Sequence, residues 1–369
     1  MMAGTERREQ LLQTLRIFSE ANGPSGFEHE LARTALEVLQ PYGESYIDSL
    51  QNVYLERAGN SRDRVLVQLD AHLDEVGLIV QSVSPQGLLR ILPLGSWVAS
   101  NVPSHRFRVR NSEGKWIPAL ATSKPPHYMS DAERNSPIVF TAIQLDVGAT
   151  SAEEISEKFK IRIAAPVVPD VDLFYDEKND VLIGKAFDCR IGCTALVETL
   201  SSLAEEELAC DVIAALSSQE EVGGRGAEVA TRMTEPDLAI VFEGTPADDT
   251  FGSPDSQQTL LGKGPMLRHL DVSMITHPGF QRFALDLAEK EGIPVQEAVR
   301  SGGGTNGGII HKMGGGIPTI VLGVPVRYIH TSYGIAKLYD LEKTADLAVA
   351  LLKAINDDTY EEILAGDGL

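Results

Sequence analysis

The chain of 369 residues has few cysteines and no long apolar segment. Its cysteines, Cys189, Cys193 and Cys210, are odd in number and contain no CxxC pair, which favours a reduced, cytoplasmic setting over a disulfide scaffold. No apolar run approaches the roughly 20 residues that a membrane-spanning helix needs. Charges interrupt the N-terminal stretch MMAGTERREQLLQTLRIF, so we expect an amphipathic helix there and not a signal peptide.

Basic residues are also scarce. Lysine and arginine together number 32 against 53 acidic residues, which gives a net charge of −21. Binding to nucleic acid or to an anionic membrane needs clustered lysine and arginine to neutralise phosphates. The charge balance therefore argues against both kinds of partner.

What remains is the composition of an ordinary globular protein, with 43% hydrophobic and 23% charged residues. A chain of this length suggests two domains, or one large domain with an insertion. Apolar runs such as CDVIAALSS, LAIVFEG and IPTIVLGVP read as buried strands, and they alternate with helical patterns. We therefore predict an α/β fold with a mostly parallel or mixed sheet that is flanked by helices on both faces.

The alternation of strand and helix patterns is interrupted between residues 77 and 167. Short strand-like runs, split by glycine, proline, asparagine and serine, predict an inserted small β-barrel domain there. The α/β domain would then consist of residues 1–76 and 168–369. Two serine–glutamate pairs, Ser25 with Glu28 and Ser151 with Glu154, have the spacing of helix capping boxes.

Acidic residues and histidines gather where the predicted strands end. In an open α/β sheet, ligands bind beyond the carboxyl ends of the strands. Each of these residues alone is explained as readily by a structural role, and Asp188 by a helix cap. Their convergence on one edge favours a metal site, and a mixture of histidines and carboxylates suits zinc, cobalt or manganese better than calcium. The candidates are His72, Asp74, Asp188, Glu220, Glu221, Glu243 and His330.

Other polar features carry less weight. The glycine cluster SGGGTNGG at 301–308 lacks the Lys-Ser/Thr ending of a phosphate loop, so a close backbone approach to a ligand or a tight crossing explains it better. Cys189 and Cys193 are better explained by packing than by zinc binding. His127, in the stretch SKPPHYM, is kept as a residue that could lie near the site.

Five ordered motifs resemble a known family. AHLDEVG, GKAFDCRIGC, QEEVGGRGA, GGGTNGG and VPVRYIH are similar, in order and spacing, to the tetrahedral (TET) and glutamyl or deblocking aminopeptidases, metallopeptidase family forty-two, some members of which have been named endoglucanases. The resemblance runs from about residue 20 to 355. It implies a fold like that of the zinc aminopeptidases and phosphorylases. It also implies peptide substrates and homo-oligomers, in which the β domain pairs subunits and the dimers form a dodecamer.

The resemblance also implies roles for the candidate residues. Two divalent ions, Zn²⁺ or Co²⁺, would be bound per subunit, with Asp188 bridging them. His72 and Glu243 would complete one site, and Glu221 and His330 the other. Glu220 would be the general base, and Asp74 would orient the groups around His72.

The sequence departs from many relatives at three positions, where Glu243, Cys189 and Asn306 stand in place of residues that are frequently aspartate or, at Cys189, aspartate or asparagine. Glu243 keeps a second enzyme class open, a dinuclear deacylase or carboxypeptidase-like hydrolase. A glycosidase that uses Glu220 and Glu221 is disfavoured, because neighbouring residues rarely straddle a sugar. A non-enzymatic alternative is an assembled shell with a degenerate site, and such a protein would bind no metal. No residue in the sequence alone identifies the preferred N-terminal amino acid.

Overall fold

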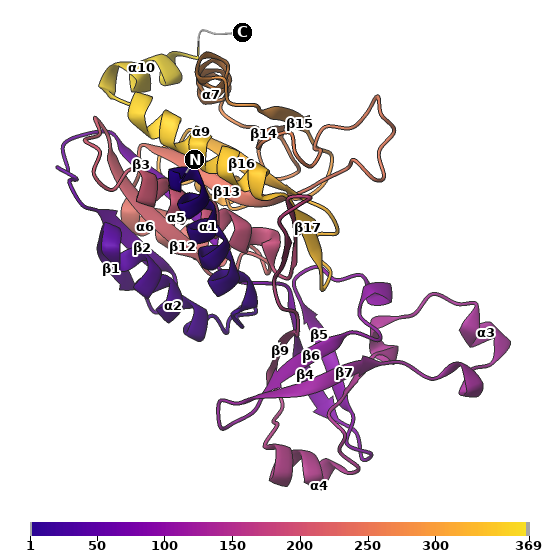
Figure 1. Ribbon diagram of the computed structural model, residues 1–369. Helices are drawn as coiled ribbons and strands as arrows, with labels where there is room; N and C mark the ends of the chain where they lie inside the picture. Colours follow the sequence, from indigo (N-terminus) through magenta and orange to yellow (C-terminus); the bar gives the residue numbers. More distant parts are fainter. Residues whose placement is uncertain (1, 367–369) are drawn as a thin grey trace.

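The computed structural model describes residues 2–366 and has two parts (Figure 1). The larger part is a mixed sheet flanked by helices, and the smaller part is a closed antiparallel barrel below it. This confirms the predicted fold class. Met1 and residues 367–369, the outer limits of the predicted catalytic domain, lie outside the described residues.

The central sheet has eight strands in the order β1-β2-β12-β3-β13-β16-β14-β15. Its four middle strands are parallel, and antiparallel pairs join β2 to β12 and β16 to β14. Every residue of β12 and β16 is buried, as expected for parallel strands that are covered on both faces. The strands are β1 (Gly43–Ile47), β2 (Val53–Arg57), β3 (Leu66–His72), β12 (Asp211–Ser217), β13 (Leu238–Pro246), β14 (Met266–Leu270), β15 (Gln296–Val299) and β16 (Thr319–Val326).

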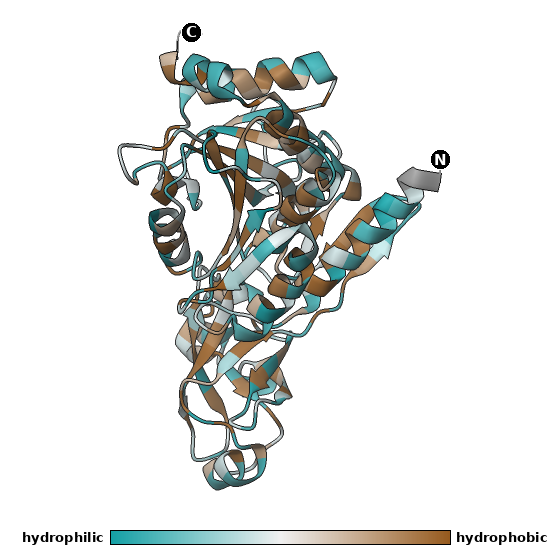
Figure 2. Ribbon diagram, turned by 90° about the vertical axis from the view of Figure 1, so that its left-hand side faces the viewer, coloured by the Kyte–Doolittle hydropathy of each residue, from teal (hydrophilic) through white to brown (hydrophobic). Residues whose placement is uncertain are grey.

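Side chains of alternate residues enter two separate cores. In β13, Leu238, Ile240 and Phe242 join the large core, whereas Ala239 and Val241 join a smaller core on the other face, as the two-residue period of a strand requires. Figure 2 shows the apolar strands between helices whose outer surfaces are hydrophilic. The large core is covered by α1 (Met2–Glu20), α2 (His29–Leu39), α5 (Phe187–Ser202), α7 (Pro278–Glu291) and α9 (Leu338–Ala354), and the smaller one by α6 (Arg225–Thr234) and α8 (Gly307–Ile310).

The barrel closes in the order β4-β5-β8-β7-β6-β9 around an apolar core of its own. An arm at residues 123–142, which contains α3 (Asp131–Arg134), leaves the barrel between β7 and β8 and points away from the sheet (Figure 1). The strands of the barrel are β4 (Gly77–Val83), β5 (Leu89–Leu94), β6 (Arg106–Arg110), β7 (Trp116–Thr122), β8 (Gln144–Asp146) and β9 (Pro166–Pro169).

The remaining elements are short or peripheral. A small sheet of β10 (Phe174–Asp176), β11 (Val181–Gly184) and β17 (Gly334–Ala336) leads into α5, and α10 (Asp357–Ala365) follows α9. No helix within residues 2–366 has both the length and the apolar character to cross a membrane.

One of the two predicted capping boxes is half formed, and the other is wrong. Ser151 caps α4 (Ala152–Glu154) by accepting a hydrogen bond from the backbone N–H of Glu154, but the Glu154 carboxylate accepts from the N–H of Thr150 and not from that of Ser151. The side chain of Ser25 caps no helix and instead donates to Asp74, and Glu28 occupies the N-cap position of α2 without a capping hydrogen bond. A capping box needs both side chains to bond with the backbone of the same helix start. Here Ser25 donates to Asp74, 49 residues away, and Glu28 accepts from the N–H of Gln219, 191 residues away.

Candidate metal centre

The predicted ligands meet at the carboxyl ends of the parallel strands. His72 is the last residue of β3, and Glu243 lies in the second half of β13 beside it. Glu220 and Glu221 follow β12 in a turn, and His330 follows β16. Because β12, β3, β13 and β16 are adjacent and parallel, these residues reach one edge of the sheet.

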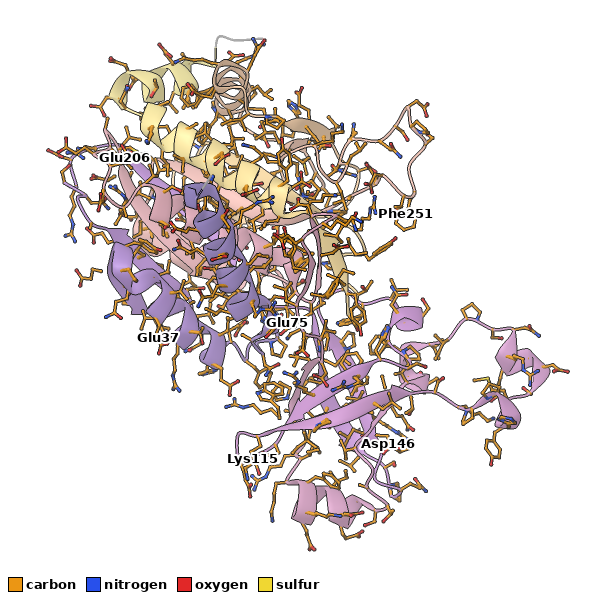
Figure 3. All side chains as sticks on the ribbon, viewed as in Figure 1. Glu37, Glu75, Lys115, Asp146, Glu206 and Phe251 are labelled. Carbon is orange, nitrogen blue, oxygen red and sulfur yellow. The ribbon has the colours of Figure 1, made fainter. Side chains whose placement is uncertain are left out.

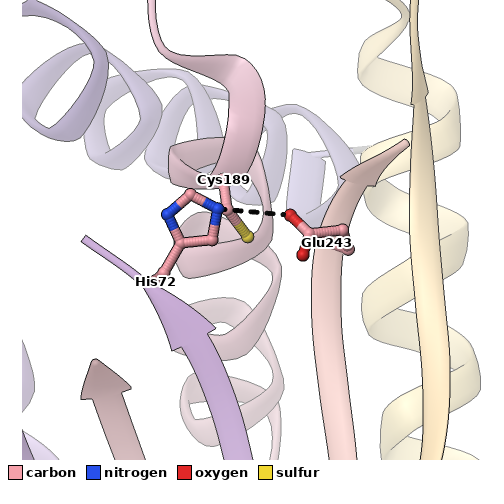
Figure 4. A group of neighbouring side chains, drawn as sticks. All are labelled: His72, Cys189 and Glu243. Atoms are coloured by element: carbon pink, nitrogen blue, oxygen red, sulfur yellow. Dashed lines mark ion pairs between the residues drawn. The ribbon is translucent and has the colours of Figure 1, made fainter. Parts of the chain in front are cut away.

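Asp188 stands between the two histidines. Its Oδ1 lies 3.0 Å from His72 Nε2, and its Oδ2 lies 3.1 Å from His330 Nε2. A second carboxylate accompanies each histidine: Glu243 Oε1 is 3.5 Å from His72 Nε2, and Glu221 Oε2 is 3.5 Å from His330 Nε2. The structure thus brings all five predicted ligands together, in two histidine–carboxylate pairs that share one aspartate. Figure 4 shows the first pair, with Cys189 beside it.

Glycines let the start of α5 approach β13 closely enough to place Asp188. A Cβ atom on Gly244 would lie 2.4 Å from the carbonyl oxygen of Phe187, so only glycine fits there. The backbone at Asp188 and Cys189 departs from helical geometry inside α5, and this turns the aspartate side chain towards the strand ends. The thiol of Cys189 donates to the carbonyl of Phe242, 3.0 Å away, which is the packing role expected for it.

Two buried carboxylates hold the turn that carries Glu220 and Glu221. Asp74 accepts hydrogen bonds from the backbone N–H of Glu220 at 2.8 Å, that of Glu221 at 3.2 Å, and the hydroxyl of Ser25 at 2.6 Å. Glu28 accepts from the N–H of Gln219 at 3.1 Å. Three consecutive amides therefore end on carboxylates, which fixes the direction in which the two glutamates point.

Asp74 also contacts the histidine. Its Oδ1 lies 3.5 Å and its carbonyl oxygen 3.1 Å from Nδ1 of His72. A hydrogen bond from Nδ1 to this carbonyl leaves Nε2 free to face Asp188, since the contact made by one ring nitrogen decides what the other can bind.

The site carries more negative charge than the side chains around it can balance. Five carboxyl groups, those of Asp74, Asp188, Glu220, Glu221 and Glu243, share it with two histidines. Burial, together with the charge of neighbouring carboxylates, raises the pKa of Glu220 to about 8 and raises those of Glu221 and Glu243.

Unlike these glutamates, Asp188 and His72 have pKa values that are shifted in favour of the charged form. Burial opposes the charged form of Asp188, but hydrogen bonds from His330 and His72 outweigh it and lower the pKa of Asp188. Burial likewise opposes protonation of His72, yet the surrounding anionic groups raise its pKa well above the usual value. Protonated imidazole is the only cation that this cluster supplies from within the described residues.

The donors fit divalent cations. Donor atoms of His72, Asp188 and Glu221 lie within 4.8 Å of one another, and so do those of His72, Cys189 and Glu243. Glu221 Oε1 is buried and has no hydrogen-bond partner among the described residues. Leaving a buried carboxylate oxygen unpaired is costly, and a cation between these groups would remove that cost. Histidine nitrogens with carboxylate oxygens are the donors typical of zinc and cobalt.

A buried ion network behind the site was missed by sequence reasoning. Glu75 binds Lys185 Nζ at 2.8 Å and Arg190 Nη2 at 3.1 Å, and all three are almost completely buried. Arg190 also donates to the carbonyls of Leu73 and Gly23, so it ties the start of α5 to the end of β3. Figure 3 shows Glu75 where the sheet domain meets the barrel. The sequence does contain one indication of this network, since Lys185 and Arg190 flank Asp188 in an otherwise apolar segment.

Two other residues singled out in the sequence lie elsewhere. His127 is exposed on the arm and does not line the cavity beside the carboxylates. Asn306 is buried beneath the site, where its amide donates to Asp70 and Ser217, both at 2.7 Å. Asparagine suits this position because its amide can donate to the buried carboxyl group of Asp70.

The cavity beside the carboxylates has a volume of about 530 Å³. Asp188, Glu220, Glu221, Glu243 and His330 lie on its wall, so the cluster is open to a ligand of amino-acid size. Its remaining wall comes from residues 300–304 and from Ser96, Gly223, Gly244, Pro246, Arg268 and Ile329.

Comparisons with known proteins give a consistent result. The family described as M42 glutamyl aminopeptidase matches residues 51–347. The glutamyl aminopeptidase of Lactococcus lactis subsp. cremoris is 31% identical over 356 residues, 96% of this chain and 99% of that protein. A TET aminopeptidase from a marine sediment archaeon of the Thaumarchaeota superposes with a TM-score of 0.92 at 35% identity, covering 96% and 99% of the two chains. The TET1 peptidase of Pyrococcus horikoshii, which can assemble into a tetrahedron or a large octahedral shell, gives 0.84 at 27% identity, covering 94% and 100%.

Proposed function

Because the chain belongs to the M42 glutamyl aminopeptidase family of metallopeptidases, we propose that it removes N-terminal residues from peptides at a dinuclear metal centre. The observation that carries the proposal is the position of Asp188, whose two oxygens face His72 and His330 at nearly equal distances. An aspartate with one oxygen towards each of two ligand sets is suited to bridge two cations.

His72 and Glu243 would hold one divalent ion and Glu221 and His330 the other, with Asp188 shared between them. Zn²⁺ and Co²⁺ suit these donors. When bound, such ions polarise the scissile carbonyl and lower the pKa of water.

Glu220 is the proposed general base. Its Oε2 lies 3.8 Å from His72 Nε2. Both Glu220 and Glu221 line the cavity, but Glu221 Oε2 is the one that lies beside His330. The carboxylate of Glu220 would take a proton from the attacking water and pass it to the nitrogen of the leaving amine. Asp74, through the backbone amides of Glu220 and Glu221, holds that carboxylate in position.

The preference for a free N-terminus follows from charge. A peptide whose first residue enters the cavity brings a positively charged α-amino group next to several carboxylates. An acylated or internal peptide nitrogen has no such charge and would leave those carboxylates without a cationic partner. Substrates with a free amino terminus should therefore bind best.

Substitutions separate the two roles. Glu220→Gln should retain metal and lose most turnover of aminoacyl p-nitroanilides, because glutamine accepts no proton. His330→Ala should lose metal occupancy. Glu228→Gln, at the exposed Arg232–Glu228 pair of α6, is the matched control and should behave as wild type. Full turnover in Glu220→Gln would eliminate the assignment of the base, and hydrolysis of N-acyl amino acids in place of aminoacyl amides would favour a deacylase.

We also propose that the chain forms homo-oligomers through the barrel and reaches a dodecamer. The arm at 123–142 exposes Tyr128 and Val139, apolar side chains that a second subunit could cover. A similar TET1 structure has a dodecamer in its asymmetric unit, and the P. horikoshii relative can assemble into a tetrahedron, which supports the proposed number of subunits. Light scattering on the purified protein should give twelve times the subunit mass of 39.9 kDa, and a monomer would rule the assembly out.

A further inference from the structure

The two histidines of the site are held in different ways. His72 is the last residue of a buried strand, its side chain is 1% exposed, and its Nδ1 donates to the carbonyl of Asp74. The side chain of His330 is 34% exposed, and within the described residues its Nδ1 has no hydrogen-bond partner. Its ring contacts Asp188 and Glu221 through Nε2 alone. The direction of this ring therefore depends on the backbone that carries it.

That backbone is a hairpin of residues 327–335. Two hydrogen bonds close it, from the N–H of Arg327 to the carbonyl of Ile335 at 2.9 Å and from the N–H of Ile335 to the carbonyl of Arg327 at 3.2 Å. Inside it, Tyr328 and His330 have positive φ values of 61° and 58°, a conformation that residues other than glycine rarely adopt. Such residues persist only where the surrounding structure fixes them. The hairpin therefore needs contacts from outside, and Arg327 at its base makes one.

Arg327 forms a bidentate ion pair with an aspartate from another loop. Its Nε lies 2.8 Å from Oδ1 of Asp249, and its Nη2 lies 2.7 Å from Oδ2. Two parallel hydrogen bonds of this kind fix the orientation of the guanidinium as well as its distance. The carboxylate is only 11% exposed, and its Oδ2 also accepts the N–H of Leu261 at 3.2 Å. The base of the hairpin is thus tied to the loop that links β13 to β14.

The same loop makes an aromatic contact with the hairpin. Phe251, labelled in Figure 3, meets Tyr328 edge-on, with ring centroids 6.0 Å apart and an interplanar angle of 81°. Tyr328 is one of the two hairpin residues with a positive φ, so this contact falls where the backbone most needs support. Two consecutive residues of the hairpin are therefore held by the one loop.

The loop is fastened to the wall of the cavity as well. Asp248, next to Asp249 in the chain, pairs with Arg300 at 3.1 Å and accepts the amides of Gln258 and Thr259. Arg300 lies on the cavity wall. Adjacent aspartates thus attach one loop to the wall and to the hairpin. A movement of the hairpin would have to break the ion pair at its base or carry with it a loop that is tied elsewhere.

We propose that Asp249 is a positioning residue for the metal centre, which through its bidentate pair with Arg327 fixes the hairpin that carries His330. The inference rests on the proposed dinuclear function and adds a residue that does not itself line the cavity. Loss of the pair lets the hairpin relax from its strained conformation, so the effect falls on the ion held by Glu221 and His330. The other ion keeps its ligands, because separate elements hold them.

Zinc titration of the full-length, chelator-treated protein against a chromophoric competitor gives the affinity of each ion without turnover. Asp249→Asn should weaken one of the two zinc ions by about 10- to 100-fold, as is typical for residues that support metal ligands, and leave the other unchanged. In the His330→Ala background, where that ion is already lost, Asp249→Asn should change nothing further.

The partner of the pair gives an independent check. Arg327→Lys should weaken the same ion nearly as much as Asp249→Asn does, because lysine keeps the charge but cannot pair with both carboxylate oxygens in one plane. The double variant should be no worse than the poorer single variant, because both changes remove one interaction. Losses that simply add would overturn the inference, since they would mean that Asp249 does not act through Arg327.

Arg8 and Glu342 supply a matched control. They join α1 to α9 with the same bidentate geometry, Nε to Oε1 at 3.0 Å and Nη2 to Oε2 at 2.9 Å, and neither residue lines the cavity. Glu342→Gln should lose about as much stability in urea as Asp249→Asn and no zinc affinity. An equal loss of zinc affinity in Glu342→Gln would attribute the effect to general loosening and overturn the inference.

Two other results would overturn the inference and leave the proposed function intact. One is wild-type affinity for both ions in Asp249→Asn, and the other is equal weakening of both. A wild-type chain that binds no zinc, or only one ion, would reject the dinuclear centre itself, and the inference with it.

Discussion

Replacement of Asp74 by asparagine tests whether the turn of residues 219–221 is held for catalysis or only for stability. The Asp74 carboxylate is fully buried and accepts one backbone amide on each oxygen, from Glu220 on Oδ1 and from Glu221 on Oδ2. Asparagine has a single acceptor oxygen and presents an NH₂ group in place of the other. One amide must then face a donor, which should cost about 1–3 kcal/mol of stability.

The chain offers a close match for this change. Asp211 is also buried and accepts two consecutive amides, from Ser61 on Oδ1 and from Arg62 on Oδ2. It lies at the other end of β12, seven residues of strand or about 20 Å from the metal site. Asp211→Asn should therefore lose a similar amount of stability while leaving the metal site unchanged.

The assay measures three quantities on both variants: the urea midpoint, the Zn²⁺ affinity by competition with a chromophoric chelator, and the turnover of an aminoacyl p-nitroanilide. Asp74→Asn should lose about 10- to 100-fold in metal affinity or activity, as is typical when a residue that supports metal ligands is changed. Asp211→Asn should lose neither. Equal losses of stability, with wild-type affinity and turnover in both variants, would refute the reasoning and leave Asp74 a purely structural residue.

Two other predictions concern stability. In the metal-free protein, the pKa of Glu220 is raised from 4.5 to about 8, so its contribution to stability is fully present below about pH 4.5 and is lost as the pH rises towards 8. The melting temperature of chelator-treated protein should therefore fall between pH 6 and 8, while that of metal-loaded protein should not. Parallel curves for the two forms would contradict the crowding of carboxylates. Arg190→Met should destabilise the protein by about 3–5 kcal/mol, because it removes one partner of the buried Glu75 and several carbonyl contacts. Urea denaturation measures this loss, and a value below about 1 kcal/mol would mean that Lys185 alone balances Glu75.

Some of this structure could be read from the sequence. The apolar run before Glu243 is uninterrupted, and the run before His72 is broken only by Gln68 and Asp70. Both runs therefore predicted buried parallel strands and a shared edge. Edge strands were harder. The segment around Arg268, in β14, has no period-two pattern of its own, and it becomes a strand through pairing with β16 and β15. Pairing of this kind depends on the partner strand more than on local propensity.

The parts of the site that sequence reasoning missed are long-range contacts. Ser25 and Glu28 matched a local capping pattern, yet the turn at 219–221 and Asp74 supplied partners that the local pattern cannot contain. Arg300 lies on the wall of the cavity, and nothing in its neighbours along the chain indicates this. Ligand residue types recur at strand ends and can be predicted, but the residues that position them depend on how distant segments pack.

We propose that the two oxygens of Asp188 face two separate cations. Anomalous diffraction from crystals of the zinc-loaded protein measures this directly. We expect two anomalous peaks per subunit, one on the side of His72 and Glu243 and one on the side of His330 and Glu221, with Asp188 between them. A map without peaks at Asp188, or with zinc bound only at other residues, would contradict it.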